Sequence, residues 1–300
     1  MVSMNRREFL NLAVSAAAGA SVAGSRAGAA ADARRPLRKA VNLGMVKTDG
    51  STLEKFKLLK ELGFDGVELN RPGGPPADEI LQARDATGLA VAGIMNATHW
   101  KVPLSDPDET VRSQGLEDLK SAMRDAKAFG APTVLLVPAV VKKGVSYSEA
   151  WKRSQAEIRK VIPLAGELGI KIAIENVWNH FLLSPLEAAR YVDELDSPSV
   201  GWFFDVGNIV LHGWPEQWIR ILGSRIINVH FKEYSRTKCE KEGPRKGFGV
   251  ELMEGDCDWP TVMKAFDEIR YSGWVIAEVP GGDAARLKFL AERMDRIIAS

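Results

Sequence analysis

The sequence predicts a single (β/α)8 TIM barrel, an α/β fold in which eight parallel strands alternate with eight helices. From Lys39 onward, short apolar runs alternate with longer amphipathic stretches, and most runs are apolar throughout, as in strands buried on both faces. Eight strand-then-helix units over roughly 265 residues match the length of a typical barrel, about 250 residues. A doubly wound sheet is the alternative, and the number of units at this length favours the barrel.

The predicted strands and helices follow one another in strict alternation. The strands are expected at residues 40–45, 66–69, 90–95, 133–137, 171–175, 201–205, 226–231 and 274–279. The helices are expected at residues 53–62, 77–87, 108–129, 147–168, 185–195, 214–222, 259–269 and 284–298. Several helices are followed by a glycine that can end them, as at Gly63, Gly130 and Gly169.

One connection, residues 232–258, is long, polar and rich in glycine. A long loop without secondary structure in a compact domain is usually a lid or a binding loop, and we expect that here. Both cysteines, Cys239 and Cys257, lie in this segment. They could form a disulfide in an oxidising compartment or remain two independent thiols.

Composition excludes several other classes of protein. The 300 residues are 45% hydrophobic and 26% charged, which is ordinary for a globular protein and unlike a disordered, collagen-like or coiled-coil chain. The net charge of +1 gives no electrostatic signature of nucleic-acid or anionic-membrane binding. No long apolar run predicts a membrane span in the barrel. With two cysteines and four histidines, any metal site must use mixed ligands.

Residues 1–33 differ in composition from the rest of the chain. Asn5-Arg6-Arg7-Glu8-Phe9-Leu10 precedes an alanine-rich, mildly apolar stretch, which is followed by the small residues Ala27-Gly28-Ala29. Adjacent arginines followed by Phe-Leu resemble a twin-arginine export signal. We therefore expect residues 1–33 to be read by the twin-arginine export machinery and removed, and the barrel, residues 39–300, to be exported to the periplasm. A helical N-terminus and an uncleaved anchor are the alternatives.

Polar side chains stand where most of the predicted strands end. In a TIM barrel the chemistry lies at the carboxyl ends of the strands, and a buried unpaired carboxylate costs several kcal/mol. Such residues must therefore be paired, protonated or bound to a metal. The candidates are Glu68, His99, Glu175, Asp205, His230 and Glu278.

Four of these residues belong to consecutive strands. Glu175, Asp205, His230 and Glu278 come from the fifth to the eighth predicted strands and would converge on one side of the barrel mouth. Three carboxylates and one imidazole form a hard, oxygen-rich ligand set that suits Mn²⁺, Mg²⁺ or Co²⁺, with Zn²⁺ possible. The alternative is that each residue makes a separate polar contact at the barrel end.

The same segments resemble the xylose isomerase-like TIM-barrel superfamily of sugar isomerases and epimerases. The nearest likeness is to L-ribulose-5-phosphate 3-epimerases, D-tagatose 3-epimerases and hydroxypyruvate isomerases, and it extends over residues 39–300. The segments that carry it are Ile172-Ala173-Ile174-Glu175-Asn176, Phe203-Phe204-Asp205-Val206-Gly207-Asn208, Asn228-Val229-His230-Phe231-Lys232-Glu233, Ala277-Glu278-Val279 and Met253-Glu254-Gly255-Asp256-Cys257-Asp258-Trp259.

The resemblance implies one divalent metal ion, with Mn²⁺ the leading candidate, held by Glu175, Asp205, His230 and Glu278. It also implies that Glu175 and Glu278 are catalytic and transfer the proton. Asn208, Lys232 and Arg236 fall at positions that contact or adjoin the substrate in similar proteins. Glu68 and His99 are further candidates for substrate binding, because they end the second strand and follow the third.

The implied function is a metal-dependent sugar isomerase or epimerase that works through a cis-enediolate. A dehydratase or lyase acting on a keto-sugar, keto-glycoside or inosose is the alternative. Lys232-Glu233 replaces the usual Lys-Asp pair, and Met253 replaces a glycine, so the substrate is open. Because sugar phosphates are cytosolic, an exported member should act on a free ketose or related polyol. The expected partners are a small sugar and a second copy of the chain in a homo-oligomer.

Two other functions on the same barrel agree less well with the sequence. An exported sugar-binding protein without activity would have a broken metal quartet, whereas all four residues are present. An endonuclease IV-like phosphodiesterase on the same barrel would need more histidines and a basic groove. Four histidines and a net charge of +1 argue against it.

Overall fold

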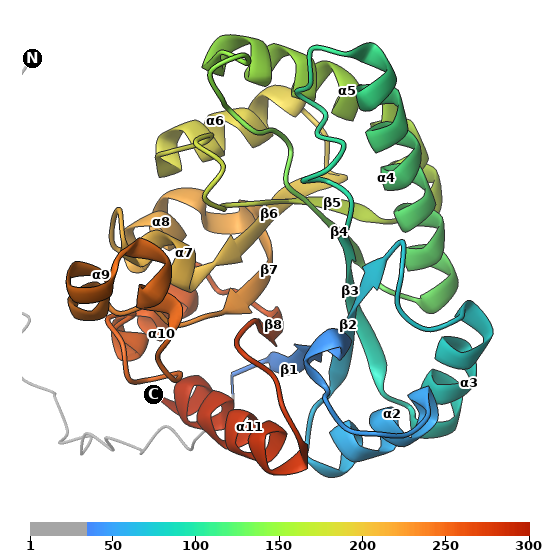
Figure 1. Ribbon diagram of the computed structural model, residues 1–300, viewed down its shortest axis with the longest axis vertical. Coiled ribbons are helices and arrows are strands. Elements are labelled where there is room, and N and C mark those ends of the chain that lie inside the picture. The colour runs from blue at the N-terminus through green and yellow to red at the C-terminus, as the bar shows by residue number, and fades with distance from the viewer. Residues whose placement is uncertain (1–34) are drawn as a thin grey trace, which may run out of the picture. The chain divides into compact units, whose positions relative to one another are not determined.

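The computed structural model describes residues 35–300, which belong to one compact unit. The predicted export signal, residues 1–33, lies outside the described residues. Within them, eight parallel strands form a closed barrel in chain order, each hydrogen-bonded to the next, and β8 pairs with β1 to close it (Figure 1). The predicted single TIM barrel is confirmed.

The strands are short and almost completely buried. Their residues alternate between the barrel interior and the layer beneath the helices, so nearly every position is apolar. They are β1 (Leu37–Asn42), β2 (Gly66–Arg71), β3 (Ala90–Asn96), β4 (Thr133–Leu136), β5 (Lys171–Glu175), β6 (Val200–Asp205), β7 (Ile226–Phe231) and β8 (Gly273–Ala277).

An outer ring of helices covers the barrel, one main helix after each strand (Figure 1). These helices are α2 (Thr52–Glu61), α3 (Ala77–Thr87), α4 (Glu109–Phe129), α5 (Tyr147–Leu168), α6 (Pro185–Leu195), α8 (Pro215–Leu222), α10 (Trp259–Glu268) and α11 (Ala284–Ala299). Shorter helices lie in the connections: η1 (Leu43–Met45), α7 (Val206–Val210), η2 (Gly223–Arg225), α9 (Arg236–Glu242) and η3 (Pro244–Phe248). No helix in residues 35–300 is long and apolar enough to cross a membrane.

Local sequence signals explain where several helices begin and end. Ser51, Ser146 and Ser184 each form a capping box with the glutamate three residues later, which satisfies free backbone N–H groups at the helix start. Gly130 and Gly169 adopt left-handed backbone conformations that end α4 and α5. Because these signals are local, the predicted helices 77–87, 147–168 and 185–195 coincide with α3, α5 and α6.

Two predicted strands are displaced from the observed ones. The first was expected at 40–45, but β1 ends at Asn42, whose side chain accepts a hydrogen bond from Gly44 N and starts η1. The last was expected to extend to residue 279, but β8 ends at Ala277, so Glu278 follows the strand directly. Both polar side chains still lie at the carboxyl-terminal face of the barrel.

The segment 232–258 was expected to lack secondary structure, and that expectation was wrong. It contains α9 and η3, and Phe248 packs against Trp178 and Tyr234, with ring centroids 4.8 Å apart in both pairs. Both cysteines are free thiols: Cys239 is half-buried, and buried Cys257 places its Sγ 3.3 Å from the carbonyl oxygen of Lys232. The structure therefore corresponds to the alternative of two independent thiols.

The barrel interior is filled below the level of the mouth. A cluster of buried side chains occupies it, with small residues such as Ala92 and Ala173 beside the large rings of Phe203 and Trp274. Phe203 lies 4.3 Å from the ring of His230, measured between centroids. This apolar packing gives the polar residues above it a closed, dry floor.

Two helical glycines provide a test of this packing. A Cβ at Gly115 in α4 would lie 2.2 Å from the backbone oxygen of Val102, whereas at Gly166 in α5 the nearest atom is Ser199 Oγ at 3.8 Å. We predict that Gly115→Ala destabilises the fold by about 1–3 kcal/mol through overpacking. Gly166→Ala, the matched control, should stabilise it by roughly 0.5–1 kcal/mol. Urea unfolding of both variants measures the difference, and equal effects would contradict the packing described for α4.

Candidate metal centre and active site

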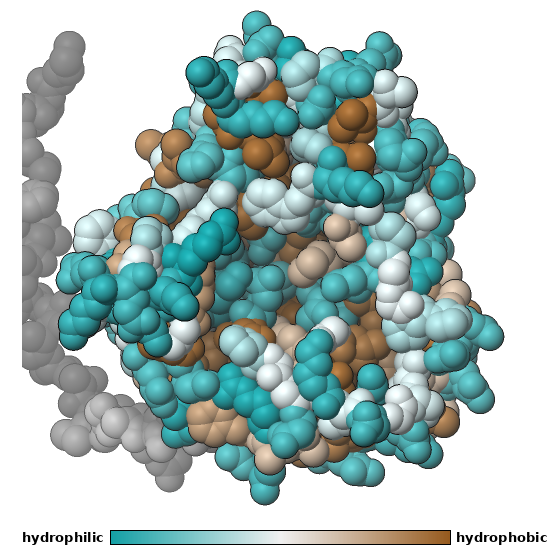
Figure 2. Space-filling view, in the orientation of Figure 1, coloured by the Kyte–Doolittle hydropathy of each residue, from teal (hydrophilic) through white to brown (hydrophobic). Residues whose placement is uncertain are grey.

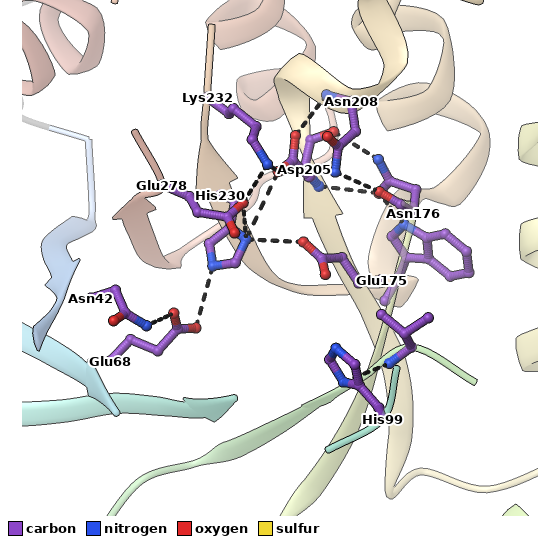
Figure 3. A network of polar contacts seen from close by, with 12 residues as sticks. Asn42, Glu68, His99, Glu175, Asn176, Asp205, Asn208, His230, Lys232 and Glu278 are labelled. Atoms are coloured by element: carbon purple, nitrogen blue, oxygen red, sulfur yellow. Dashed lines mark hydrogen bonds and ion pairs between the residues drawn. The ribbon is translucent and has the colours of Figure 1, made fainter. Parts of the chain in front are cut away.

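Four side chains at the mouth of the barrel point toward one another (Figure 3). Glu175 and Asp205 are the last residues of β5 and β6, His230 lies near the end of β7, and Glu278 directly follows β8. One ligand atom from each of the four lies within 4.8 Å of the others. Strand order thus brings together residues that are as much as a hundred positions apart in the chain.

The imidazole of His230 stands at the centre of this cluster. Its Nδ1 lies 3.0 Å from Glu175 Oε1, 3.4 Å from Glu278 Oε2 and 3.9 Å from Asp205 Oδ2. The three carboxylates therefore surround the same ring nitrogen, and the other nitrogen, Nε2, faces away from them (Figure 3).

The cluster carries an excess of buried negative charge. His230 and Asp205 are fully buried, Glu175 is nearly so, and Glu278 is the most open of the four, at 31% exposed. Lys232 supplies the nearby ammonium, with Nζ 2.7 Å from Glu278 Oε2 and 3.4 Å from Asp205 Oδ2. One ammonium cannot balance three carboxylates, so burial of all of them requires protonation or a further cation.

The pKa values of the cluster reflect this imbalance. Burial raises the pKa of Asp205 to about 8 and also raises the pKa of Glu175. Burial opposes the charge of Glu278 too, but the Lys232 ammonium and His230 outweigh it and lower the pKa of Glu278 to about 2. For His230, burial is outweighed by the surrounding carboxylates, with Glu68 the largest, and the pKa is raised.

One buried oxygen of Asp205 accepts no hydrogen bond within the described residues, which suits a metal ligand. Asp205 Oδ1 accepts a hydrogen bond from Asn208 N at 2.7 Å, whereas the buried Oδ2 accepts none within residues 35–300. An orphaned buried oxygen beside two other carboxylates and an imidazole nitrogen is the arrangement of a divalent-metal site. The donor set of oxygens with one nitrogen suits Mn²⁺, Mg²⁺ or Co²⁺.

Glu68 was predicted to bind substrate, but the structure places it behind His230. Its Oε1 lies 3.3 Å from His230 Nε2, and its Oε2 accepts a hydrogen bond from Asn42 Nδ2 at 2.9 Å. Figure 3 shows Glu68 between Asn42 and His230. Asn42 Nδ2 also donates to Asn70 Oδ1, and Glu68 is completely buried. When a metal ion displaces the proton on Nδ1, an Nε2–H directed to Glu68 would leave the Nδ1 lone pair facing the carboxylate cluster. A carboxylate behind a metal-binding histidine fixes the ring and its tautomer in this way.

Asn208 was also predicted to bind substrate, and most of its polar atoms are used within the protein. Its Nδ2 donates to the backbone oxygen of Asn176, and its own backbone oxygen accepts a bond from Trp178 Nε1. Asn176 in turn donates to Asp205 O at 2.7 Å and accepts from Asp205 N at 3.1 Å. Asn176 and Asn208 therefore hold the backbone and side chain of Asp205 in place. This role of Asn176 was not predicted from the sequence, where the residue is only part of a motif.

Arg236 does not reach the cluster as a free cation. Its Nε donates to Val210 O at 3.0 Å and its Nη2 to Gly213 O at 2.8 Å, and the guanidinium lies over the ring of Trp214. These contacts attach α9 to the connection between α7 and α8, and the substrate contact expected of Arg236 stays a prediction.

His99 faces the same mouth from the loop after β3. It is buried, and its Nδ1 accepts a hydrogen bond from Val137 N at 3.3 Å (Figure 3). Burial lowers the pKa of His99 to about 4, so the ring is neutral near pH 7. The neutral ring is held at the end of β4, which leaves Nε2 as its remaining polar atom.

Glu233 has a structural role that the sequence analysis missed. Its buried carboxylate accepts hydrogen bonds from the backbone N–H groups of Tyr234, Met253 and Cys257 and from the indole Nε1 of Trp259. It joins the end of β7 to the segment that enters α10. The departure from the family's usual aspartate therefore affects loop attachment and not the ligand set.

A cavity of about 410 Å³ opens beside the cluster. Lys232 and Glu278 line it together with Asn42, Asn70, Met95 and Phe248, four residues that were not among the candidates from the sequence. The space-filling view shows this face of the barrel hollowed at its centre, with mainly hydrophilic surface inside (Figure 2). The cavity is therefore wide enough for a small polar molecule next to the four-residue cluster.

Comparison with known proteins agrees with this geometry. The family model described as xylose isomerase-like TIM barrel matches residues 56–297. The chain belongs to this family. L-ribulose-5-phosphate 3-epimerase UlaE of Escherichia coli (strain SE11) is 26% identical over 244 residues, which cover 76% of this chain and 81% of the relative.

Solved structures of similar fold include a D-tagatose 3-epimerase-like protein, with a TM-score of 0.73, 22% identity and coverage of 87% of this chain and 98% of that one. The E. coli 3-keto-D-glucoside 4-epimerase YcjR has a TM-score of 0.71 and 16% identity, covering 88% of this chain and 98% of that one. At these identities the structures show the shared fold. The similar proteins are sugar epimerases, which are isomerases, and the predicted enzyme class is confirmed at that level.

The role assigned to Glu68 is testable with Glu68→Gln. The substitution removes the carboxylate behind His230 while keeping its shape, so we predict that the dissociation constant for Mn²⁺ rises about 10–100-fold. Isothermal titration calorimetry of the metal-stripped protein measures it. Glu61→Gln, which changes an exposed glutamate at the end of α2, should leave the constant unchanged. A folded Glu68→Gln protein with wild-type affinity would contradict the assignment.

His99 predicts a specific pH dependence of stability. Its folded-state pKa of about 4 lies below the ordinary value of 6.5, so its contribution is complete above pH 6.5 and is lost as the pH falls toward 4. At pH 5 the loss should be about 2 kcal/mol. Urea unfolding at pH 7 and pH 5 should therefore show a larger loss for the wild type than for His99→Gln. Equal losses in the two proteins would show that His99 is not held neutral.

Proposed function

We propose that the protein is a divalent-metal-dependent sugar isomerase or epimerase that acts on an unphosphorylated ketose or related polyol. The observation that carries the proposal is the cluster of Glu175, Asp205, His230 and Glu278, whose ligand atoms lie within 4.8 Å of one another beside an open cavity. The epimerases among its relatives support the same reaction class.

When bound, the metal ion would act as a Lewis acid that stabilises negative charge on the substrate oxygens as the adjacent C–H proton leaves. Glu175 ends β5 and Glu278 directly follows β8, on either side of β6 and β7, so the two carboxylates approach the cluster from different strands, and Glu278 also lines the cavity. One removes the proton to give a cis-enediolate, and the other returns a proton from its own side. Return to the opposite face of the same carbon gives an epimer, and return to the neighbouring carbon gives an aldose or ketose.

Lys232 prepares Glu278 for this role. The ammonium, 2.7 Å from Glu278 Oε2, keeps the carboxyl group ionised at neutral pH and fixes its direction. Phe203 beneath His230 and the buried Asn176 around Asp205 keep the other groups in place and water out of the floor. The chain's own residues thus hold two proton-transfer groups at set positions around one small volume.

The substrate and location follow from the N-terminal sequence. Residues 1–33 have the composition of a twin-arginine signal, and export would place the enzyme in the periplasm, away from cytosolic sugar phosphates. We therefore propose an unphosphorylated substrate for this chain, in contrast to the phosphorylated sugar in the name of its E. coli relative.

The two-carboxylate mechanism is tested by proton NMR in D₂O over a panel of ketoses, with Glu175→Gln and Glu278→Gln. Each variant should lose about 10²–10⁴-fold in turnover, since each lacks one proton-transfer group. If the reaction is an epimerisation, each variant retains one of the two carboxylates. It should still exchange deuterium at the reacting carbon of the one epimer whose C–H proton faces that carboxylate. Glu240→Gln, an exposed residue of α9, is the matched control and should behave as the wild type.

Metal content of each variant, measured by plasma mass spectrometry, separates loss of the proton-transfer group from loss of the ion. Near-normal turnover in either metal-loaded variant would contradict the two-carboxylate assignment. Release of water or of an aglycone from the substrate would instead identify a dehydratase or lyase.

A further inference from the structure

The cavity of about 410 Å³ beside the four-residue cluster is called the reaction cavity below. A second, larger hollow adjoins it. Its volume is about 820 Å³, and it is lined by the segment after β1, residues 43–55, and by the segment from the end of β2 to the start of α3, residues 69–80. Both segments follow the carboxyl ends of their strands, so this side hollow opens on the same face of the barrel as the four-residue cluster. None of the residues assigned above to metal binding or proton transfer lines it.

The side hollow and the reaction cavity share a wall. Asn70 lines both spaces. Where β1 ends, Asn42 and Met45 line the reaction cavity, and the residues between them, Leu43 and Gly44, line the side hollow. Asn42 donates to Asn70 Oδ1 at 2.8 Å, which fixes the side chain between the two spaces. A ligand that extends past Asn70 would therefore pass from one space into the other.

The combined space is larger than a monosaccharide needs. Pockets of about 300–1,000 Å³ take drug-sized ligands, and a single sugar ring is smaller than such a ligand. The reaction cavity, at about 410 Å³, falls within that range and would hold the reacting sugar by itself. The adjoining 820 Å³ is left for a further part of the substrate.

The lining of the side hollow has the chemistry of a sugar-binding surface. Its floor includes the buried apolar side chains of Leu43, Leu69 and Ile80. Its rim carries both donors and acceptors, among them the ammonium groups of Lys47 and Lys55, which form no ion pair within residues 35–300. An apolar floor with polar groups at the edge suits a sugar ring, which has C–H faces and a periphery of hydroxyl groups.

The loop on the far side of the hollow is held in place by its own contacts. Arg71 is ion-paired with Asp125 at 2.7 Å, and its Nη1 donates to Gly73 O and Pro75 O. On the near side, Thr52 Oγ1 donates to Glu79 Oε2 at 2.7 Å and joins α2 to α3. The hollow is thus bounded by fixed segments, as expected of a preformed binding site.

We propose that the side hollow binds a second sugar ring joined to the reacting one, so that the substrate is a keto-glycoside or ketose disaccharide. This inference rests on the proposed function, because it concerns the substrate of the same site. It places the reacting carbon at the four-residue cluster and the second ring between residues 43–55 and 69–80.

The test compares one-ring and two-ring substrates in the metal-loaded protein. Deuterium exchange in D₂O is measured for fructose against isomaltulose, and for a methyl keto-glucoside against keto-sucrose. The two-ring member should have a kcat/KM about tenfold or more above its one-ring partner, since pocket contacts give discrimination of about 10–200-fold. Equal values within both pairs would overturn the inference.

Variants of the hollow provide the second readout. Thr48→Trp, which fills the hollow, and Lys55→Ala should each lower kcat/KM for the two-ring substrates about tenfold more than for the one-ring substrates. Lys57→Ala, an exposed lysine of the same helix that does not line the hollow, is the matched control and should leave both values unchanged. A uniform loss for one-ring and two-ring substrates would place the hollow outside the binding site.

Saturation-transfer NMR separates failure of this inference from failure of the proposed function. Contacts to the second ring of isomaltulose that disappear in Thr48→Trp would support the side hollow even if no deuterium exchange occurs, in which case the proposed reaction alone would be wrong. Exchange without contacts to the second ring would overturn the side hollow and leave the reaction intact.

Discussion

Burial of three carboxylates around one imidazole is the constraint on which the rest of this site depends. Glu175, Asp205 and Glu278 approach His230 Nδ1 to within 3.0–3.9 Å, and the ammonium of Lys232 contacts Asp205 and Glu278. Bringing these charges together without a cation would cost several kcal/mol for each unpaired group. A divalent ion would remove most of that cost, and Asp205 Oδ2, which accepts no hydrogen bond within the described residues, would be one of its ligands.

The barrel brings the four side chains of the cluster to one face, and a layer of polar side chains around them sets the directions in which they point. Parallel strands deliver residues to the same face, but their side chains must also be held at set angles. Glu68 and Asn42 orient His230, Asn176 fixes the end of β6, and Glu233 attaches the segment before α10. Asn42 and Glu233 also line the cavity beside the cluster, whereas Glu68 and Asn176 are buried and contact protein groups. Their hydrogen bonds fix the directions in which the four side chains of the cluster point.

The fold and the convergence of the four-residue cluster could be predicted from the sequence because both depend on patterns that repeat along the chain. Apolar runs fixed the strands to within a few residues, and one acidic or histidine residue at each of four consecutive strand ends indicated the cluster. The roles of Glu68 and Arg236 could not be obtained in the same way. Both were expected at the substrate, yet Glu68 faces His230 Nε2 and Arg236 donates to Val210 O and Gly213 O. The partner of a long polar side chain depends on loops distant in sequence, which no local pattern records.

The most direct test of the account is the stoichiometry of Mn²⁺ binding to the metal-stripped protein, measured by electron paramagnetic resonance of the free ion. We predict one tightly bound ion per chain and loss of that binding in Asp205→Asn, which removes the charge of the carboxylate whose Oδ2 accepts no hydrogen bond within the described residues. It also predicts that Asp193→Asn, a change at an exposed aspartate paired with Arg225, keeps the ion. Wild-type Mn²⁺ binding by a folded Asp205→Asn protein, or no binding by the wild type, would contradict the central claim that this cluster is a metal centre.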